Sequence, residues 1–251
     1  MFTTSPDGVR IAYERQGHGP ALLLLQGFEA TRHIWHKLGY VEPLSQEFTV
    51  ITMDRRGIGE SDMPTDPAAY SIERVLGDVE AVLQACEVRR YKVWGHSFGG
   101  STALQLATRS SQVERAVIAG SFFGRVYPQE RIDEIVNWFE SYLEAKAKGT
   151  LAELGFDAEE DIYLSQMNLP AQIACWRALV HWPIARPQNI HCPLLVYVGE
   201  ADERVATPLK ESRQEIEQAG VQLRFFENLD HQQEITEREI LLEPVLSFLR
   251  G

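Results

Sequence analysis

The sequence has little cysteine and few basic residues for its length, and each shortage excludes a class of protein. Only 3 cysteines occur in 251 residues, at Cys86, Cys175 and Cys192. Neither a paired-cysteine zinc site nor a disulfide framework is expected from so few, and all three are expected to be small, buried apolar residues. Lysine and arginine number 24 against 36 acidic residues, so the net charge of −12 argues against binding nucleic acid through a basic surface.

Long apolar runs and ligand-binding motifs are also missing. The longest apolar run, Ala21–Leu25, is far shorter than the roughly 18 to 20 residues of a membrane-spanning helix, so no membrane span is expected. The N-terminal residues lack the basic start and apolar stretch of a signal peptide, which makes a cytoplasmic location the default expectation. Because no His-Glu-x-x-His and no Gly-Lys-Ser/Thr phosphate loop occurs, we expect no cofactor and no metal site.

The chain does contain a regular alternation of short β-rich segments and amphipathic helical segments. The expected strands are Phe2–Thr4, Val9–Glu14, Ala21–Leu25, Phe48–Met53, Lys92–Trp94, Ala116–Ala119, Leu194–Val198 and Gln222–Phe226. The expected helices of this alternation are His33–Ser45, Ile72–Cys86, Gly99–Thr108, Pro208–Ala219 and Glu234–Leu249. Continuously apolar middle strands indicate burial on both faces. The pattern therefore predicts an α/β fold with a doubly wound, mostly parallel eight-stranded sheet.

Residues 125–187 interrupt the alternation, with two expected helices, Gln129–Lys148 and Leu169–His181, and no convincing strand. A helical block inserted between buried strands is expected to cover the carboxyl edge of the sheet, where α/β folds bind ligands. We therefore expect a core domain of residues 1–124 and 188–251 with a helical cap of residues 125–187. The aromatic residues expected to face a pocket are Phe123, Tyr127, Trp138, Tyr142 and Trp176. An ordinary helical layer with aromatic residues in its own core is the alternative.

The segment Trp94–Gly100 contains Gly-x-Ser-x-Gly between an apolar strand and a helix. A serine on so tight a turn has a strained backbone, and flanking glycines allow the chain to approach closely. The turn lifts the Ser97 hydroxyl to the sheet edge and places it at a helix N-terminus, whose N–H groups and dipole stabilise an oxyanion. Ser97 is therefore the predicted nucleophile.

Four motifs in order resemble those of the α/β-hydrolase fold family, over essentially the whole chain. They are Leu25-Gln26-Gly27-Phe28, Asp54-Arg55-Arg56-Gly57-Ile58-Gly59-Glu60-Ser61, Gly95–Gly100, and Gly199-Glu200-Ala201-Asp202 with Asp230-His231. The resemblance is to the serine esterase or lipase-like branch with a helical cap. It implies a catalytic triad in the order Ser97, Asp202 and His231, because a serine needs a base and the base needs an orienting acid.

Other residues compete for the roles of base and acid. Among seven histidines, His231 follows the last expected strand and emerges at the same edge as Ser97, whereas the side chain of His96 is expected to point away toward packing. Glu200 and Glu203 are alternatives for the acid. Asp54 is also acidic, but the tight turn with Gly57 and Gly59 after it suggests a structural role. Some family members take the acid from the loop that here is 120–123, which has no carboxylate and so favours Asp202.

The resemblance also implies an oxyanion hole made of the backbone N–H groups of Phe28 and Phe98. Relatives usually carry histidine before Gly27, but this chain carries Gln26. A glutamine side chain offers both a donor and an acceptor, so it can hold the loop in the same way.

These residues predict a serine hydrolase that cleaves a carboxylic ester, lactone or thioester of a small, mostly hydrophobic substrate through an acyl-enzyme. Haloalkane dehalogenases and epoxide hydrolases of this fold use an aspartate nucleophile, which Ser97 replaces here. A carbon–carbon bond hydrolase, a cofactor-free perhydrolase and a non-catalytic small-molecule-binding protein stay open as alternatives. The expected partner is a small-molecule substrate, and the expected assembly is a monomer or homodimer.

Overall fold

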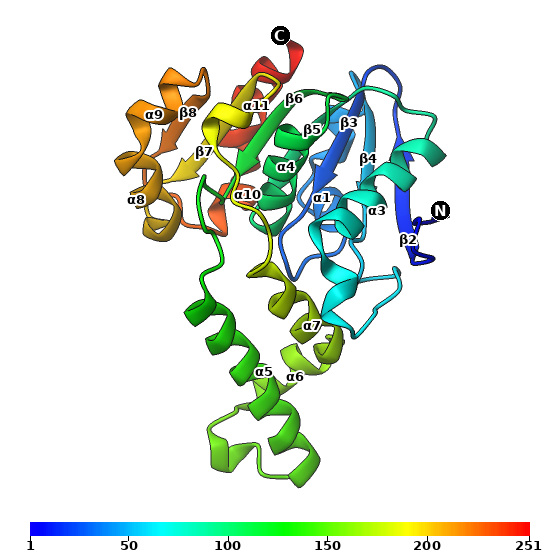
Figure 1. Cartoon of the computed structure of the whole chain (residues 1–251), viewed down its shortest axis with the longest axis vertical. Coiled ribbons are helices and arrows are strands. Elements are labelled where there is room, and N and C mark those ends of the chain that lie inside the picture. Colours follow the sequence, from blue (N-terminus) through cyan, green and yellow to red (C-terminus); the bar gives the residue numbers. More distant parts are fainter.

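The computed structural model describes residues 1–251 and contains one mixed sheet between two layers of helices (Figure 1). The eight strands lie in the order β1-β2-β4-β3-β5-β6-β7-β8. Their bounds are β1 Phe2–Thr4, β2 Arg10–Gln16, β3 Ala21–Leu25, β4 Thr49–Met53, β5 Tyr91–His96, β6 Val113–Ala119, β7 Leu194–Gly199 and β8 Gln222–Phe226. Strand β2 is antiparallel to β1 and β4, and all other neighbouring strands are parallel. The predicted fold class is confirmed.

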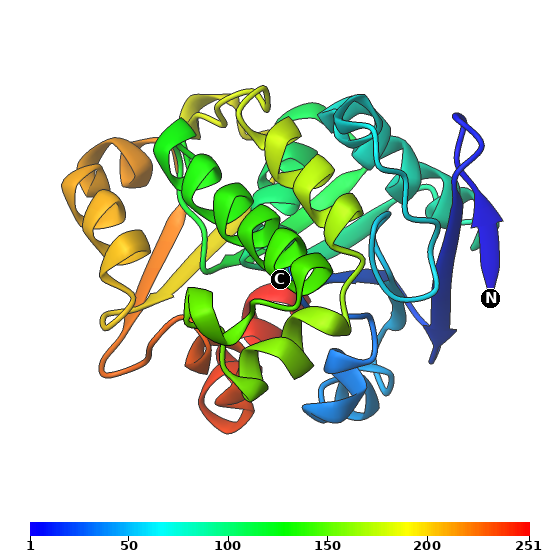
Figure 2. The same cartoon turned by 90° about the horizontal axis from the view of Figure 1, so that it is seen from below.

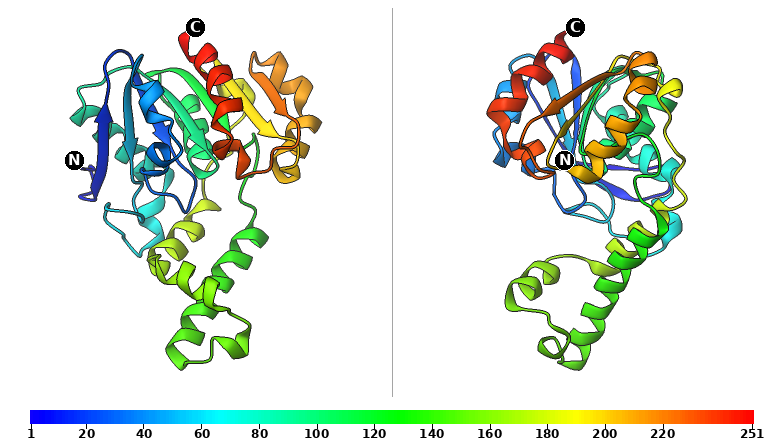
Figure 3. Two further views of the ribbon diagram at one scale, coloured as in Figure 1. Left: turned by 180° about the vertical axis from the view of Figure 1, so that it is seen from behind. Right: turned by 90° about the vertical axis from the view of Figure 1, so that its left-hand side faces the viewer.

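Helices cover both faces of the sheet (Figures 1 and 3). One face packs against α3 (Ile72–Ala85), α4 (Phe98–Arg109), α8 (Glu203–Glu211) and α9 (Arg213–Gln218). The other face packs against α1 (Ile34–Lys37), α2 (Val41–Leu44), α10 (Gln233–Thr236) and α11 (Arg238–Arg250). Three short 3₁₀ helices complete the chain: η1 (Pro67–Tyr70), η2 (Ala152–Leu154) and η3 (Pro187–Asn189).

The apolar run of β3 shows how the sequence produces these layers. Successive side chains of a strand point to opposite faces of the sheet. Leu23 and Leu25 pack into the cluster with α3 and α4, while Leu22 and Leu24 pack into the cluster with α1 and α11. Because both faces are covered, every residue of the run is buried, which is why no polar residue interrupts it.

Three of the expected helices differ from the observed ones. Gly39, at φ +75°, divides the segment 33–45 into the two short helices α1 and α2. The helix expected over Pro208–Ala219 is divided between α8 and α9 at Ser212. Helix α8 begins at Glu203 and contains Pro208 in its interior, where the missing N–H leaves one carbonyl without an intrahelical donor. The segment 234–249 forms α10 and α11, separated at Glu237.

Between β6 and β7 the chain forms α5 (Gln129–Lys148), α6 (Ala158–Ser165) and α7 (Leu169–Leu179), which project from the carboxyl edge of the sheet (Figures 1 and 3). Helices α5 and α7 lie side by side (Figure 2) and contribute most of a separate apolar cluster. The two connections to the sheet run together and form an isolated bridge between Gly124 and Ala185. These features support our proposal that residues 125–187 are a cap domain on a core of 1–124 and 188–251.

Helix α6 is not among the helices expected from the sequence, although acidic residues mark its N-terminus. Asp157 accepts a hydrogen bond from the backbone of Glu160, and the Glu160 side chain accepts one from the backbone of Asp157. This reciprocal arrangement is a capping box, whose signature is an acidic or hydroxyl residue followed three positions later by glutamate.

The structure contains no helix with both the length and the apolar character needed to cross a bilayer. All three cysteines are free thiols. Cys86 and Cys175 are buried as expected, whereas Cys192 is half-buried.

The turn after β4 is held by a buried ion pair. The Arg56 side chain is almost inaccessible to solvent and donates to both carboxylate oxygens of Asp78 in α3, each at 2.7 Å. Two further bonds join Arg56 to Asp7, at 2.8 and 3.0 Å. A buried ion pair of this kind is costly to break, because the remaining charge loses its partner without regaining water.

We expect Asp78→Asn to lower the free energy of unfolding by about 3 kcal/mol at pH 7, measured by urea denaturation, because the buried Arg56 then keeps only the partly exposed Asp7 as a carboxylate partner. The matched control is Glu144→Gln, which breaks an exposed pair with Lys148 on α5 and should leave the urea midpoint close to that of the wild type. Equal effects of the two substitutions would contradict this interpretation.

Candidate active site

Ser97 lies at the turn between β5 and α4, in a backbone conformation that few non-glycine residues adopt. Its φ and ψ are 56° and −116°. A Cβ at Gly95 would lie 2.1 Å from the carbonyl oxygen of Gly99, and one at Gly99 would lie 2.1 Å from that of Leu25. Only glycine fits at both positions, so the spacing Gly-x-Ser-x-Gly is a requirement of backbone packing. The turn presents the Ser97 hydroxyl at the carboxyl edge of the sheet.

The structure brings the three residues of the expected triad together. The hydroxyl oxygen of Ser97 lies 2.9 Å from Nε2 of His231, and Nδ1 of His231 lies 2.6 Å from Oδ2 of Asp202. Nδ1–H donates to the carboxylate, which leaves Nε2 free to accept the serine proton. Asp202 follows β7 and His231 follows β8, so both loops leave the same edge of the sheet as Ser97.

The carboxylate of Asp202 is held ready to accept this hydrogen bond. Burial alone would raise the pKa of Asp202, but the hydrogen bond from His231 and the charges of His231 and Arg204 outweigh burial and lower the pKa. The Arg204 guanidinium lies 3.9 Å from the carboxylate and 3.4 Å from Nδ1 of His231. Asp202 is therefore ionised at neutral pH and orients the imidazole.

The rival residues lie elsewhere or have other partners. Asp54 is fully buried and pairs with Arg32 while accepting the backbone N–H groups of Arg32 and Glu60. The sequence predicts that the His96 side chain points away from the site toward packing. His96 is indeed buried, but it contacts the loop that carries His231. Its Nε2–H donates to the carbonyl of His231 at 2.9 Å, and burial lowers the pKa of His96 to about 3, so it stays neutral and braces the base loop.

Glu234, in α10, belongs to the site although the sequence interpretation did not assign it a role. It is fully buried, and its Oε2 lies 3.8 Å from Nδ1 of His231. Burial raises the pKa of Glu234 to about 8. One feature of the sequence could have pointed to Glu234: it is an acidic residue three positions after His231, on the apolar side of a short helix.

The loop expected to form the oxyanion hole lies against the nucleophile. A Cβ at Gly27 would lie 3.5 Å from Cβ of Ser97. The N–H of Phe28 donates to no protein acceptor, and Phe98 is the first residue of α4, so its N–H has no intrahelical acceptor. Gln26 replaces the usual histidine by donating its Nε2–H to the carbonyl of Met53 at 2.8 Å, which fixes the loop to β4.

Arg55 connects this loop to the cap helices. Its guanidinium donates to the carbonyl of Phe28 at 2.7 Å and to the side-chain oxygen of Gln172 in α7 at 2.8 Å. It also lies 4.3 Å from the centre of the Phe28 ring, which packs against Trp176 at 4.6 Å. The position of Phe28 is thus set by residues of both the core and the cap.

A cavity of about 780 Å³ opens at Ser97 and His231 between the sheet edge and the cap. Of the expected pocket residues, Tyr127, Trp138 and Trp176 line it. Phe123 and Tyr142 do not. Phe123 packs against the core cluster, and Tyr142 is buried inside the cap, where its hydroxyl binds Asp161 and Lys146.

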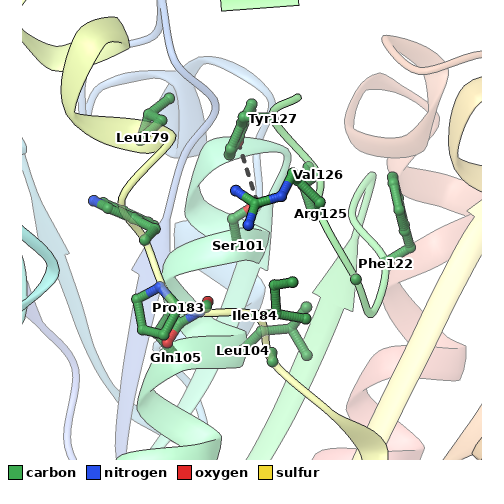
Figure 4. A pocket seen from close by; sticks show the side chains of 13 residues that line it. Ser101, Leu104, Gln105, Phe122, Arg125, Val126, Tyr127, Leu179, Pro183 and Ile184 are labelled. Carbon is green, nitrogen blue, oxygen red and sulfur yellow. Dashed lines mark hydrogen bonds between the residues drawn. The ribbon is translucent and has the colours of Figure 1, made fainter. Parts of the chain in front are cut away.

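A second cavity, of about 30 Å³, lies where the two cap connections cross α4 (Figure 4). The hydroxyl of Tyr127 is hydrogen-bonded to that of Ser101 across 3.2 Å at its edge. Ser101 is in turn bonded to Ser121 at 2.9 Å. This chain of hydroxyl groups fixes the start of the cap to the helix that begins at the nucleophile.

One cluster has the ligand types of a metal site. The nitrogens of His96 and His231 and a carboxylate oxygen of Glu234 lie within 4.8 Å of one another. Both His231 nitrogens and Nε2 of His96 are already used in hydrogen bonds to Ser97, Asp202 and the His231 carbonyl. A cation here would have to break the hydrogen bonds of His231, so the cluster fits a hydrogen-bonded network better than a metal centre.

Comparison with known proteins gives consistent matches. The family model of the alpha/beta hydrolase fold matches residues 20–159. An uncharacterized protein of Mycobacterium tuberculosis is 35% identical over 115 residues, which are 45% of this chain and only 33% of that protein. The chain thus spans about a third of the length of its mycobacterial relatives. Fluoroacetate dehalogenase from Burkholderia sp. is 28% identical over 224 residues, covering 74% of this chain and 72% of that protein.

Solved structures match over nearly the whole chain. A hydrolase from Pseudomonas aeruginosa PA01 has a TM-score of 0.79 at 25% identity, covering 100% of this chain and 98% of that one. Est816, described as an N-acyl homoserine lactone degrading enzyme, has a TM-score of 0.75 at 27% identity, covering 98% and 99%.

We expect Gly120→Ala to lower the rate at which a fluorophosphonate probe labels Ser97 by at least about tenfold. Gly120 has φ +60°, and a Cβ there would lie 2.7 Å from Cε1 of His231, so the methyl group displaces the imidazole. The matched control is Gly149→Ala, which places the same residue at φ +72° with no atom within 4 Å. It shares the backbone strain and should label at the wild-type rate, and equal labelling of both variants would refute the argument.

Proposed function

Because the chain belongs to the α/β-hydrolase fold family, we propose that it is a serine hydrolase that cleaves a carboxylic ester or lactone. The observation that carries the proposal is the continuous hydrogen-bonded path from Ser97 through His231 to Asp202, with separations of 2.9 and 2.6 Å. A serine hydroxyl is a weak nucleophile at neutral pH, and this path supplies the base and the orienting acid that it requires.

In the proposed reaction the Ser97 oxygen attacks the substrate carbonyl carbon while Nε2 of His231 takes the hydroxyl proton. The imidazolium that forms is stabilised through Nδ1–H by the Asp202 carboxylate. The N–H groups of Phe28 and Phe98 bind the negatively charged oxygen of the tetrahedral intermediate. His231 then protonates the leaving alkoxide, and after the acyl-enzyme forms it activates water to release the acid.

The cavity supports a small, mostly hydrophobic substrate. Aromatic side chains of the cap, among them Trp138 and Trp176, line part of it, and most of the exposed area of its wall is apolar. Charged side chains, among them Arg131, Glu134 and Arg204, line the rest and leave room for a polar group on the substrate. The 27% identity to a lactone-degrading enzyme over nearly the whole chain favours including lactones in the substrate class.

Other chemistries compatible with the triad are tested by the choice of substrate. A carbon–carbon bond hydrolase would cleave a vinylogous diketone, and a perhydrolase would form a peracid when hydrogen peroxide replaces water. A binding protein would hold a small molecule without turnover. One relative is named as a fluoroacetate dehalogenase. Dehalogenases of this fold displace the halide with an aspartate carboxylate, and this chain has Ser97 at that position. We therefore expect no fluoride release from fluoroacetate.

We expect the wild type to hydrolyse a short-chain p-nitrophenyl ester, and Ser97→Ala and His231→Ala each to lower kcat by about 10³-fold or more. Release of p-nitrophenol is measured at pH 7.5. Matched controls are Ser165→Ala, on the exposed face of α6, and His33→Ala, whose side chain is 57% exposed. The controls should keep wild-type rates, and undiminished turnover by Ser97→Ala would rule out the proposed nucleophile.

A further inference from the structure

Glu234 connects the loop that carries the acid to the loop that carries the base. Its Oε1 accepts the backbone N–H of Gly199, the last residue of β7, at 2.8 Å. Its backbone carbonyl accepts the hydroxyl of Tyr197 at 3.0 Å. Asp202 follows Gly199 by three residues and His231 precedes Glu234 by three. The two hydrogen bonds therefore fix the relative positions of Asp202 and His231.

The second oxygen of the same carboxyl group has no such partner. Oε2 is buried, accepts no hydrogen bond, and lies 3.8 Å from Nδ1 of His231 and 3.9 Å from Nε2 of His96. Gly120 packs against it so closely that a Cβ there would lie 2.8 Å from Oε2. Burying a carboxyl oxygen without a hydrogen-bond partner costs free energy. That Oε2 is buried in this way beside His231 suggests that it has a role in the site.

The groups around Glu234 determine its charge. Burial is the main reason that the pKa of Glu234 is raised to about 8, and the nearby carboxylates of Asp202 and Asp230 act in the same direction. The bond from Gly199 and the guanidinium of Arg204 oppose the rise. His231, His96 and Tyr197 complete the titratable groups that face it. Glu234 is accordingly a neutral acid at pH 7 and becomes anionic in mildly alkaline solution.

We propose that Glu234 is a positioning residue for His231, which it holds beside Asp202, and that the Glu234 carboxylate, 3.8 Å from Nδ1, stabilises the His231 imidazolium together with Asp202. This inference rests on the proposed function, in which His231 becomes positively charged in the transition state. It assigns a role to an acidic group outside the triad.

The direction of the pH effect follows from linkage. In the transition state His231 carries a positive charge, which favours the anionic form of Glu234 and so lowers the pKa of Glu234 below its value in the free enzyme. The reaction therefore becomes faster as pH rises through about 8, where Glu234 of the free enzyme loses its proton to solvent. Above that range the rate is constant again, at the higher level.

The test compares the pH dependence of kcat/KM for a p-nitrophenyl ester between wild type and Glu234→Gln from pH 6.5 to 10. Glutamine keeps an oxygen for the Gly199 N–H but cannot ionise. The ratio of wild-type to variant kcat/KM should rise at least about fivefold across pH 8, the effect of one unit charge near 4 Å even in a water-like dielectric. The control is Glu239→Gln in α11, whose side chain is 90% exposed and whose profile should follow the wild type. A constant ratio for Glu234→Gln would overturn the inference.

A second measurement separates this inference from the proposed function. As Glu234 ionises near pH 8, the nitrogen-15 chemical shifts of the His231 imidazole should show a step in the wild type and no such step in Glu234→Gln. If that step is present but no ester is hydrolysed, the proposed function fails and the coupling of Glu234 to His231 stands. If esters are hydrolysed and the step is absent, the proposed function stands and the inference fails.

Discussion

The candidate site depends on how closely the backbone approaches itself around Ser97. The serine is held at positive φ because its own N–H donates to the carbonyl of Ala119 at 2.8 Å, while the N–H of Gly99 donates to that of Gln26 at 3.0 Å. The turn is therefore bonded to the ends of both neighbouring strands, β6 and β3. The loops that follow β3 and β6 thus border the Ser97 hydroxyl, and His231 reaches it from the loop after β8. The position of the turn decides whether these separate loops meet at one hydroxyl.

Most of the sheet could be predicted from the sequence because its strands are buried on both faces. Continuous apolarity located the run Ala21–Leu25 and the core of Leu194–Gly199 to within one residue. Helix ends were predicted less well, because they depend on the backbone conformation of single residues, which the apolar pattern does not reveal. The positive φ of Gly39 splits one expected helix, and burial of its neighbours overrides the preference of Pro208 for a helix start.

The residues that meet at the site differed in how visible they were. Ser97 and His231 could be identified because their motifs carry their own local context, a turn between strand and helix and a loop after the last strand. Glu234 could not be identified, because its place in the site depends on a hydrogen bond to Gly199, 35 positions earlier in the chain. The same holds for the pocket, since composition does not tell Tyr142, which faces the interior of the cap, from Trp138, which faces the cavity.

The bridge between Gly124 and Ala185 has an evolutionary consequence. The chain leaves the core and returns to it at neighbouring positions. The helical insert is therefore topologically one long loop between β6 and β7, and the bridge holds the two ends of that loop together. The entropy of closing a flexible loop grows only with the logarithm of its length, and doubling the length costs about 0.6 kcal/mol. The insert can therefore change in length at little cost to the sheet, and the lining that it contributes to the cavity can change with it. The exception is α7, because its Gln172 accepts a hydrogen bond from Arg55, which also holds Phe28 beside the candidate site.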